Sequence, residues 1–415
     1  MQTHSLPLLA LVLGAAACSS PPAEPAPAPP PPPALRATSF GLPTGLEVEL
    51  LAGPCGDQLA IALLRPAGTD HDPPGRSGMA RLAGRIAAAA QPAREVSVGR
   101  DHTLELFVVP GSRLGETLEA IAAGSEPLRP DPERLGAARA GLLADLAEQR
   151  GGIAERTARS FAAEAVLQSR GGGWIGGVAE QIEAITEEDL AAFWRASHAP
   201  AGARLVVVGD LEPAQTRRRI EGAFAALPAV EPAPAREALE ARVSGTLVMG
   251  EAPAALSLAV RAPALGDPLF PAFLVLATRL GQTEVGVDVA YDPVEAPEVL
   301  FVAGALAAGE TPDGAADRVR RAVDQAVRGA ITAADVTAAR ERHRLLLGLG
   351  ALDPASCRPS PRDLARARAL RSPLGWSGPS LSEALDTITE AQASDARALF
   401  SPGRTAAVVA GGAIR

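Results

Sequence analysis

Apolar and polar positions along the chain follow two alternating patterns. Short apolar runs bounded by Gly and Pro predict strands, whereas apolar residues that repeat every three to four positions predict helices. In the first half we expect a hairpin of two strands, Glu47–Leu51 and Leu59–Leu64, which turns at residues 53–56. Further strands are predicted at Thr103–Val109 and Leu205–Val208. The helices predicted in this half are Ser77–Ala90, Leu114–Ala123, Pro132–Gln149, Ile153–Gln168 and Thr186–Ser197.

The second half carries a similar series of elements. Its predicted strands lie near Gly245–Met249, Leu256–Arg261, Val287–Tyr291 and Val299–Ala303, and its predicted helices are Pro268–Leu280, Gly314–Arg328, Ala333–Leu347 and Ser360–Leu370. The stretch ITEEDLAAFWRASHAPAGARLVVVGD, from Ile185, is echoed by ITEAQASDARALFSPGRTAAVVAGG, from Ile388. Each stretch begins with a helix capping box, runs through a helix, stops at a proline and enters a strand.

A repeat of about 200 residues indicates a duplicated domain, because solenoid repeats have periods of only about 20 to 50 residues. Strands at the two ends of each copy, with helices between them, predict an α+β fold. We therefore expect two homologous domains, each a mostly antiparallel sheet with helices packed on one face. The predicted domains span residues 36–227 and 241–415, and the Pro-rich stretch 228–240 links them.

The N-terminus carries a processing signal. Leu6–Ala17 is an apolar run too short to cross a bilayer, and it ends in Ala-Ala-Ala followed by Cys18. This pattern resembles a bacterial lipobox, which implies a signal peptide at residues 1–17 and acylation of Cys18. The alternative is an ordinary secretory signal with a chance cysteine. The residue after the cysteine, Ser19, implies sorting to the outer membrane, so we expect a lipid-anchored protein of the cell envelope that faces the periplasm.

A Pro-rich segment and two further cysteines fit that compartment. Pro21–Pro33 is almost pure Pro and Ala, which favours an extended, stiff spacer within the predicted linker 18–35. Cys55 and Cys357 lie far apart without metal-binding spacing, so they form either a disulfide or, as we favour, two unpaired thiols. The net charge of −9 and the lack of a clustered basic stripe argue against a nucleic-acid partner.

The segment PPGRSGMARLAGRI, which begins at Pro73, resembles the zinc-binding helix of the pitrilysin/insulinase-type metallopeptidases, a family that includes the mitochondrial processing peptidases. That family places two histidines four residues apart on one helix, with a glutamate base just before the second histidine. Here Arg81 and Arg85 occupy the histidine positions and Gly84 occupies the glutamate position. A guanidinium has no lone pair to offer and stays protonated, so it cannot bind a cation.

The resemblance extends to the rest of the zinc site. The family's third ligand is a glutamate on a later helix, and Asp145 stands in its place within RAGLLADL, while Ala138 stands near the position of a second acidic residue. A single shortened carboxylate without histidines does not make a zinc site. We expect one of two arrangements. Either Arg81 and Arg85 face Asp145 across the former site, or both reach solvent and Leu82, Ala83 and Ile86 fill the pocket.

Two further segments carry the resemblance: the stretch from Gly171 through ITEEDLAAFW to LVVVGDLEP, and RAPALGDPLFPAFLVLATRLG in the second half. Active members follow the second of these with an arginine and a tyrosine that grip the substrate backbone. In this chain Tyr291 lies in a predicted strand and Arg279 lies within the preceding helix, so we expect the substrate clamp to be absent. Beyond His4 in the signal peptide, the histidines are scattered along the chain at His71, His102, His198 and His343 and lack the spacing of metal ligands.

The resemblance implies a non-catalytic subunit that partners an active zinc metallopeptidase of the same family. No cofactor is expected in this chain, since the zinc would lie in the partner, and unfolded peptides are possible ligands. A second hypothesis is a stand-alone envelope lipoprotein that binds peptides or another protein. A third, disfavoured by the lost ligands, is an active zinc endopeptidase with a rearranged site.

Overall fold

The computed structural model describes residues 36–413 except 55, 91–93, 127–128, 149–152, 168–176, 229–245, 250, 265, 283–286, 294–297, 348–359 and 371–377. All of these belong to one compact unit, Pro33–Arg415. The signal peptide, Cys18, the Pro-rich spacer, Cys55, Cys357 and most of the linker 228–240 lie outside the described residues.

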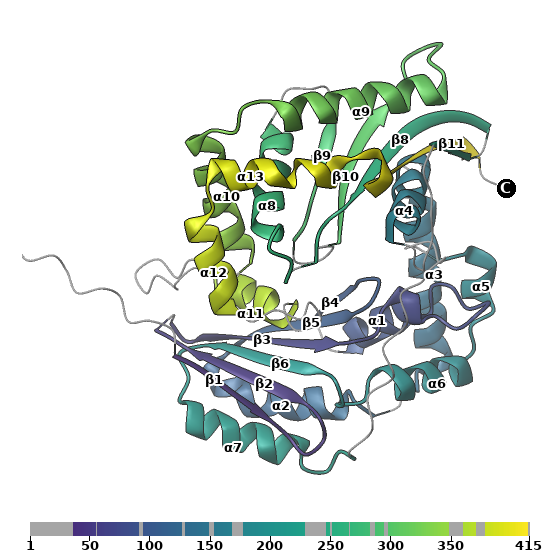
Figure 1. Ribbon diagram of the computed structural model, residues 1–415. Coiled ribbons are helices and arrows are strands. Elements are labelled where there is room, and N and C mark those ends of the chain that lie inside the picture. The colour runs from purple at the N-terminus through teal and green to yellow at the C-terminus, as the bar shows by residue number, and fades with distance from the viewer. Residues whose placement is uncertain are drawn as a thin grey trace, which may run out of the picture. The chain divides into compact units, whose positions relative to one another are not determined.

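The first sheet has six strands in the order β1-β2-β6-β3-β5-β4 (Figure 1). All neighbours are antiparallel except β2 and β6, which run parallel. The strands are β1 (Arg36–Gly41), β2 (Glu47–Ala52), β3 (Gln58–Arg65), β4 (Arg94–Val98), β5 (Thr103–Pro110) and β6 (Arg204–Gly209).

The hairpin predicted between the second and third strands is wrong. The strands β2 and β3 form as expected, but β6 lies between them and pairs with both. The reason lies in the composition of β6, because Leu205–Val208 is apolar on both faces and every one of these residues is fully buried. Such a strand buries the most apolar surface in the centre of a sheet, where both faces are covered. Neither β1 nor β4 is among the predicted strands, because β1 has little apolar alternation and β4 has it over only a few residues, around Val96 and Val98.

The second sheet repeats the first. Its order is β7-β11-β8-β10-β9, which matches β2-β6-β3-β5-β4 strand for strand. The single parallel pair, β7 with β11, corresponds to β2 with β6. This confirms the predicted α+β fold with two homologous units. The strands are β7 (Thr246–Met249), β8 (Glu251–Arg261), β9 (Asp288–Ala290), β10 (Val299–Ala305) and β11 (Thr405–Ala413).

The predicted helices form within a few residues of their expected ends. The capping boxes at Thr186 and Thr389 are both present. The helix after Thr389 is shorter than expected and continues as a 3-10 helix at Ala396–Phe400. The helices are α1 (Met79–Ala90), α2 (Leu114–Ala123), α3 (Pro132–Glu148), α4 (Ile153–Leu167), α5 (Ala179–Glu183), α6 (Glu187–Ser197), α7 (Pro213–Phe224), α8 (Phe270–Gln282), α9 (Pro312–Arg328), α10 (Ala333–Leu346), α11 (Pro361–Leu370), α12 (Gly378–Thr387) and α13 (Glu390–Asp395).

The two halves exchange one helix each. Helix α4 of the first half packs on β8 and β11 of the second sheet, and α11 of the second half packs on β3 and β6 of the first (Figure 1). These are equivalent strands of the two repeats, so the exchange is reciprocal. Burial explains why it occurs. Residues on one face of the first sheet, such as Leu50 and Val207, are covered by α2 and α7, whereas residues on the other face, such as Ala62 and Val206, pack on α11.

No helix among the described residues has both the length and the apolar composition that a membrane span requires.

Candidate functional site

Helix α1 carries the segment that resembles a zinc-binding helix, and Asp72 fixes its start. The two Asp72 carboxylate oxygens accept hydrogen bonds from the backbone N–H groups of Gly78 at 2.7 Å and Ala80 at 2.8 Å. Gly78 has a φ of 96°, and a Cβ there would lie 2.6 Å from the Ile182 side chain, so glycine is required. Burial raises the pKa of Asp72 to about 6 against the opposing effect of these backbone hydrogen bonds.

The buried face of α1 packs on α3 and α6. Leu82, Ala83 and Ile86 lie in one apolar cluster with Ala138 and Leu142 of α3. Ala138, which stands near the expected outer acidic position, is therefore part of the hydrophobic core. The space between α1 and α3 is filled by side-chain packing, as the second of the two predicted arrangements requires.

Part of the first predicted arrangement, in which the arginines face Asp145, is present as well. The Arg85 guanidinium forms an ion pair with the Asp145 carboxylate, which joins α1 to α3. The guanidinium lies against the backbone of α3 at Gly141, where a Cβ would come within 2.6 Å of Arg85 Nη2. Both side chains are over a third exposed, so the pair stabilises the fold by no more than about 1 kcal/mol. Arg81 is half-buried on the same helix.

Gly84 is buried against the edge strand β4. A Cβ at this position would lie 2.8 Å from Val98 Cγ2 and 3.3 Å from Val96 Cγ1. The first distance is shorter than normal carbon–carbon contact, so even alanine requires a shift of the valine. A glutamate, which the resembled motif has here, would have to displace the β4 side chains to reach the space between α1 and α3.

The described histidines lie apart and have other roles. His71 Nδ1 accepts a hydrogen bond from the Gly68 N–H at 3.2 Å, and His102 Nδ1 lies 2.7 Å from Asp101 Oδ1. Within the described parts of the chain, no three His, Cys, Asp or Glu side chains gather closely enough to hold a metal ion. The residues between α1 and α3 do not fit a zinc ion, because the positions that would ligate it hold arginine.

Two of the buried histidines, His198 and His343, have lowered pKa values. His198 stacks on Trp194 with ring centroids 3.5 Å apart, and burial lowers its pKa well below the usual value, with further effects from Arg65 and Arg94. His343 Nε2 lies 2.9 Å from Thr278 Oγ1, and burial lowers its pKa to about 4. Both histidines act in packing.

In the second half, the side chains of Arg279 and Tyr291 contact other elements of the fold. Arg279 Nε donates to the Ala326 carbonyl at 3.0 Å, and its Nη1 lies 3.3 Å from Asp335 Oδ2, so the side chain joins α8 to α9 and α10. Tyr291 follows β9 directly, and its ring contacts Phe273 edge-on at 5.3 Å. Burial raises the pKa of Tyr291 well above its usual value. Residues 283–286, where the family's clamp would begin, lie outside the described residues.

A buried ionic network joins β3, β5 and the edge strand β4 of the first sheet, and the apolar pattern of the sequence does not predict it. Glu105 Oε1 accepts from Arg65 Nε at 3.1 Å, and its other oxygen lies 2.6 Å from Arg94 Nη2. Burial opposes ionisation of Glu105, but the two guanidiniums outweigh it, and the pKa of Glu105 lies below its usual value. Arg65 also donates to the His198 carbonyl at 2.5 Å. The available signal is a charged residue inside an otherwise apolar strand, as in TLELFVV and LAIALLR.

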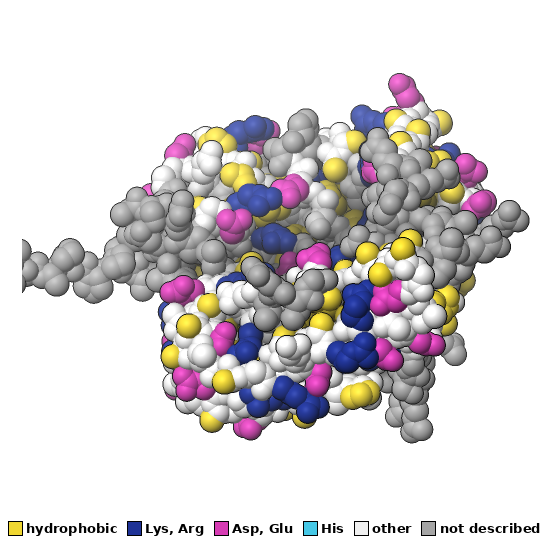
Figure 2. Space-filling model, turned by 90° about the horizontal axis from the view of Figure 1, so that it is seen from above, with side chains coloured by type: hydrophobic (Ala, Val, Ile, Leu, Met, Phe, Trp, Pro, Cys, Tyr) yellow, Lys and Arg dark blue, Asp and Glu magenta, His cyan; other side chains and the backbone are white. Residues whose placement is uncertain are grey.

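Charges on the surface are mixed. Figure 2 shows arginines and acidic side chains interspersed over the face that it displays. Elsewhere on the surface, local ion pairs form between Arg217 and Glu221 and between Arg328 and Asp324.

Comparisons with known proteins support the fold. Residues 184–342 match the family model described as "Peptidase M16 inactive domain". No protein with a curated description matches the sequence. A protease from Helicobacter pylori has a similar structure, with a TM-score of 0.70 at 15% identity over 91% of this chain and 100% of that one. The peptidase M16 inactive domain from Pseudomonas fluorescens gives a TM-score of 0.70 at 16% identity over 92% and 98%.

The periplasmic protease PqqL from Escherichia coli is also similar. Its first half gives a TM-score of 0.64 at 14% identity and covers 92% of this chain and 93% of that half. The whole of PqqL gives a TM-score of 0.64 at 15% identity, and the match covers 48% of its length. At these identities the solved structures establish the fold.

Proposed function

We propose that this protein is a non-catalytic member of the peptidase M16 (pitrilysin/insulinase-type) family. The main support for this proposal is the set of side chains that occupies the space between α1 and α3. An arginine–carboxylate pair, Arg85 with Asp145, joins the two helices where ligands would be needed. Gly84 occupies the sequence position of the glutamate base, and it packs against β4. A single carboxylate that is already paired with an arginine, without histidines or a general base, supplies neither a bound zinc ion nor an activated water.

We further propose that the chain works beside an active zinc metallopeptidase of the same family. The likeness to PqqL supports this, because the fold of this chain corresponds to the first half of that protein, whose other half belongs to the same polypeptide. In this proposal a separate partner chain with an intact H-x-x-E-H motif supplies the corresponding second unit. That partner holds the zinc, and the two chains together take up unfolded peptides.

The proposal places the protein in the bacterial cell envelope, anchored through acylated Cys18. Two observations support that location. The N-terminal sequence resembles a lipobox, and PqqL is described as periplasmic.

Capture and reconstitution test the partnership. The tagged chain is captured from its native envelope, and co-purifying proteins are searched for an H-x-x-E-H homologue. The purified homologue is then assayed on an unfolded peptide with and without this chain. We expect a complex whose hydrolysis is faster than that of the homologue alone. As a control, a homologue whose glutamate base is replaced should bind this chain and remain inactive in the complex.

Two results would contradict the proposal in different ways. If no homologue is captured while the chain alone binds unfolded peptide, the stand-alone lipoprotein hypothesis is correct. If the complex with the base-less homologue still hydrolyses peptide, the chemistry belongs to this chain, and the non-catalytic assignment fails.

A further inference from the structure

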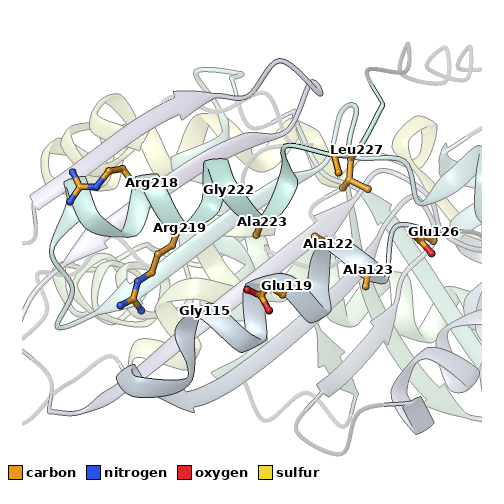
Figure 3. Close-up of a pocket in the computed structure, with 11 residues that line it drawn as sticks. Gly115, Glu119, Ala122, Ala123, Glu126, Arg218, Arg219, Gly222, Ala223 and Leu227 are labelled. Atoms are coloured by element: carbon orange, nitrogen blue, oxygen red, sulfur yellow. The ribbon is translucent and has the colours of Figure 1, made fainter.

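Helices α2 and α7 lie side by side on the first sheet and leave a groove between them (Figure 3). The groove has a volume of about 550 Å³. It is separate from the space between α1 and α3. The residues that line it are Gly115, Glu119, Ala122, Ala123, Glu126, Arg218, Arg219, Gly222, Ala223, Ala226 and Leu227.

The floor of the groove consists of small residues, so another backbone can approach closely. Along α2 the lining positions recur at helical spacing from Gly115 onward, and along α7 they recur likewise toward Ala226. At Gly115 and Gly222 a Cβ would meet no other atom within 4 Å, which shows that both positions open into free space.

The two walls of the groove carry opposite charges. Glu119 and Glu126 belong to the α2 side, and Arg218 and Arg219 belong to the α7 side (Figure 3). All four side chains are exposed, and none of them forms an ion pair with another described residue.

Charged residues elsewhere on the same two elements behave differently. Just before α2, Arg113 pairs with Glu116 of that helix at 2.7 Å, and on α7 Arg217 pairs with Glu221 at 2.7 Å. The side chains outside the groove are therefore satisfied within the chain, whereas those that line it remain available to a partner.

We propose that this groove is the contact surface between two copies of the chain. Two copies related by a two-fold axis that runs along the groove bring the arginine wall of each against the glutamate wall of the other. A two-fold interface requires a surface that complements itself, and a groove with one wall of each sign meets that requirement. A groove with a single sign of charge would instead need a foreign partner of opposite charge.

Charge reversal on each wall tests this proposal. In one variant of the full chain, Arg218→Glu with Arg219→Glu, the groove becomes wholly acidic. In the other, Glu119→Arg with Glu126→Arg, it becomes wholly basic. Sedimentation equilibrium at low salt is expected to show a dimer for the native chain. Each variant alone should dimerise at least about 100-fold more weakly, because like charges then face each other. An equimolar mixture of the two variants should recover the dimer.

A matched control changes as much charge elsewhere. The variant Arg195→Glu with Arg321→Glu alters exposed arginines of α6 and α9 and should dimerise like the native chain. A monomeric native chain would overturn the proposal. So would a dimer that both reversals leave intact, or a mixture of the two variants that stays monomeric. Binding of a foreign amphipathic helix to a monomeric native chain would assign the groove to another partner.

Discussion

Arg139 and Arg340 make the same pair of hydrogen bonds in the two halves of the molecule. Arg139 on α3 donates through Nε and Nη2 to two carbonyls at 3.3 and 2.7 Å. Arg340 on α10 does so at 2.7 and 2.7 Å. The acceptors stand at equivalent places just before the two capping boxes, at Ile182 and Ile185 in the first half and at Leu385 and Ile388 in the second. This correspondence aligns the two repeats with each other residue by residue in this region.

Replacing either arginine should destabilise its own half. Because each guanidinium satisfies two carbonyls at a helix end, Arg139→Leu and Arg340→Leu should each lower the free energy of unfolding by about 1–3 kcal/mol. Arg→Lys, with one donor head in place of the fork, should lie between the native protein and the leucine variant. Urea denaturation measures these effects, and the exposed Arg321→Leu serves as the control. A leucine variant as stable as the native chain would show that water replaces the guanidinium at no cost.

Acid should destabilise the protein through its buried histidines. The pKa of His343 is about 4 in the folded state, so His343 stays neutral there while the unfolded chain takes up a proton below about pH 6.5. Its contribution to stability is present above pH 6.5 and is lost as the pH falls toward 4, at up to about 1.4 kcal/mol per pH unit. His198 acts in the same direction.

Unfolding free energies measured from pH 7.5 to 4 check this expectation. The variant His343→Asn should have a shallower slope than the native chain. Asp72 acts in the opposite direction, because its raised pKa of about 6 means that its unfavourable burial is relieved as the pH falls below 6. Asp72→Asn should therefore steepen the acid loss. Identical slopes in all three proteins would contradict the assignment.

Restoring the motif alone should not create a protease. In the triple variant Arg81→His, Gly84→Glu, Arg85→His, the new glutamate meets Val98 at a Cβ distance of 2.8 Å. In addition, Asp145 is one methylene shorter than the family's third ligand, and Ala138 is buried where a supporting acid is needed. We expect neither tight zinc binding nor peptide hydrolysis. Adding Val98→Ala and Asp145→Glu separates the steric obstacle from the short ligand. Measurable turnover in the triple variant itself would show that the scaffold is still competent.

The membrane anchor makes a separate prediction. If Cys18 is acylated, as proposed, Cys18→Ala should leave either a processed protein released from the membrane fraction or an uncleaved precursor, because the acyl chains that would hold the protein are then missing. Fractionation and N-terminal sequencing distinguish these outcomes from the native, membrane-bound form. A processed Cys18→Ala protein that still sediments with membranes would mean that something other than the lipid holds it there.

The sequence predicts most of the helices and the repeat, because these depend on local periodicity, but it misses α5, α7 and α12. It fails for the position of β6. The pairing of strands about 150 residues apart in sequence depends on which strand buries the most apolar surface in the centre of the sheet. The local sequence pattern does not show that. The Arg85–Asp145 pair is only one of two arrangements that the sequence allows, since exposed arginines have several acceptors in reach. The packing of Gly84 on β4 cannot be foreseen, because β4 itself has too weak a pattern.

The central claim is that this chain performs no zinc-dependent hydrolysis by itself, and metal content measured together with activity tests it most directly. The purified full chain is analysed for zinc by elemental analysis and incubated with an unfolded peptide, with and without a chelator. We predict no stoichiometric zinc and no hydrolysis that the chelator abolishes, because arginines and a glycine stand where two ligands and the base are needed. About one zinc per chain, together with chelator-sensitive hydrolysis, would contradict the account.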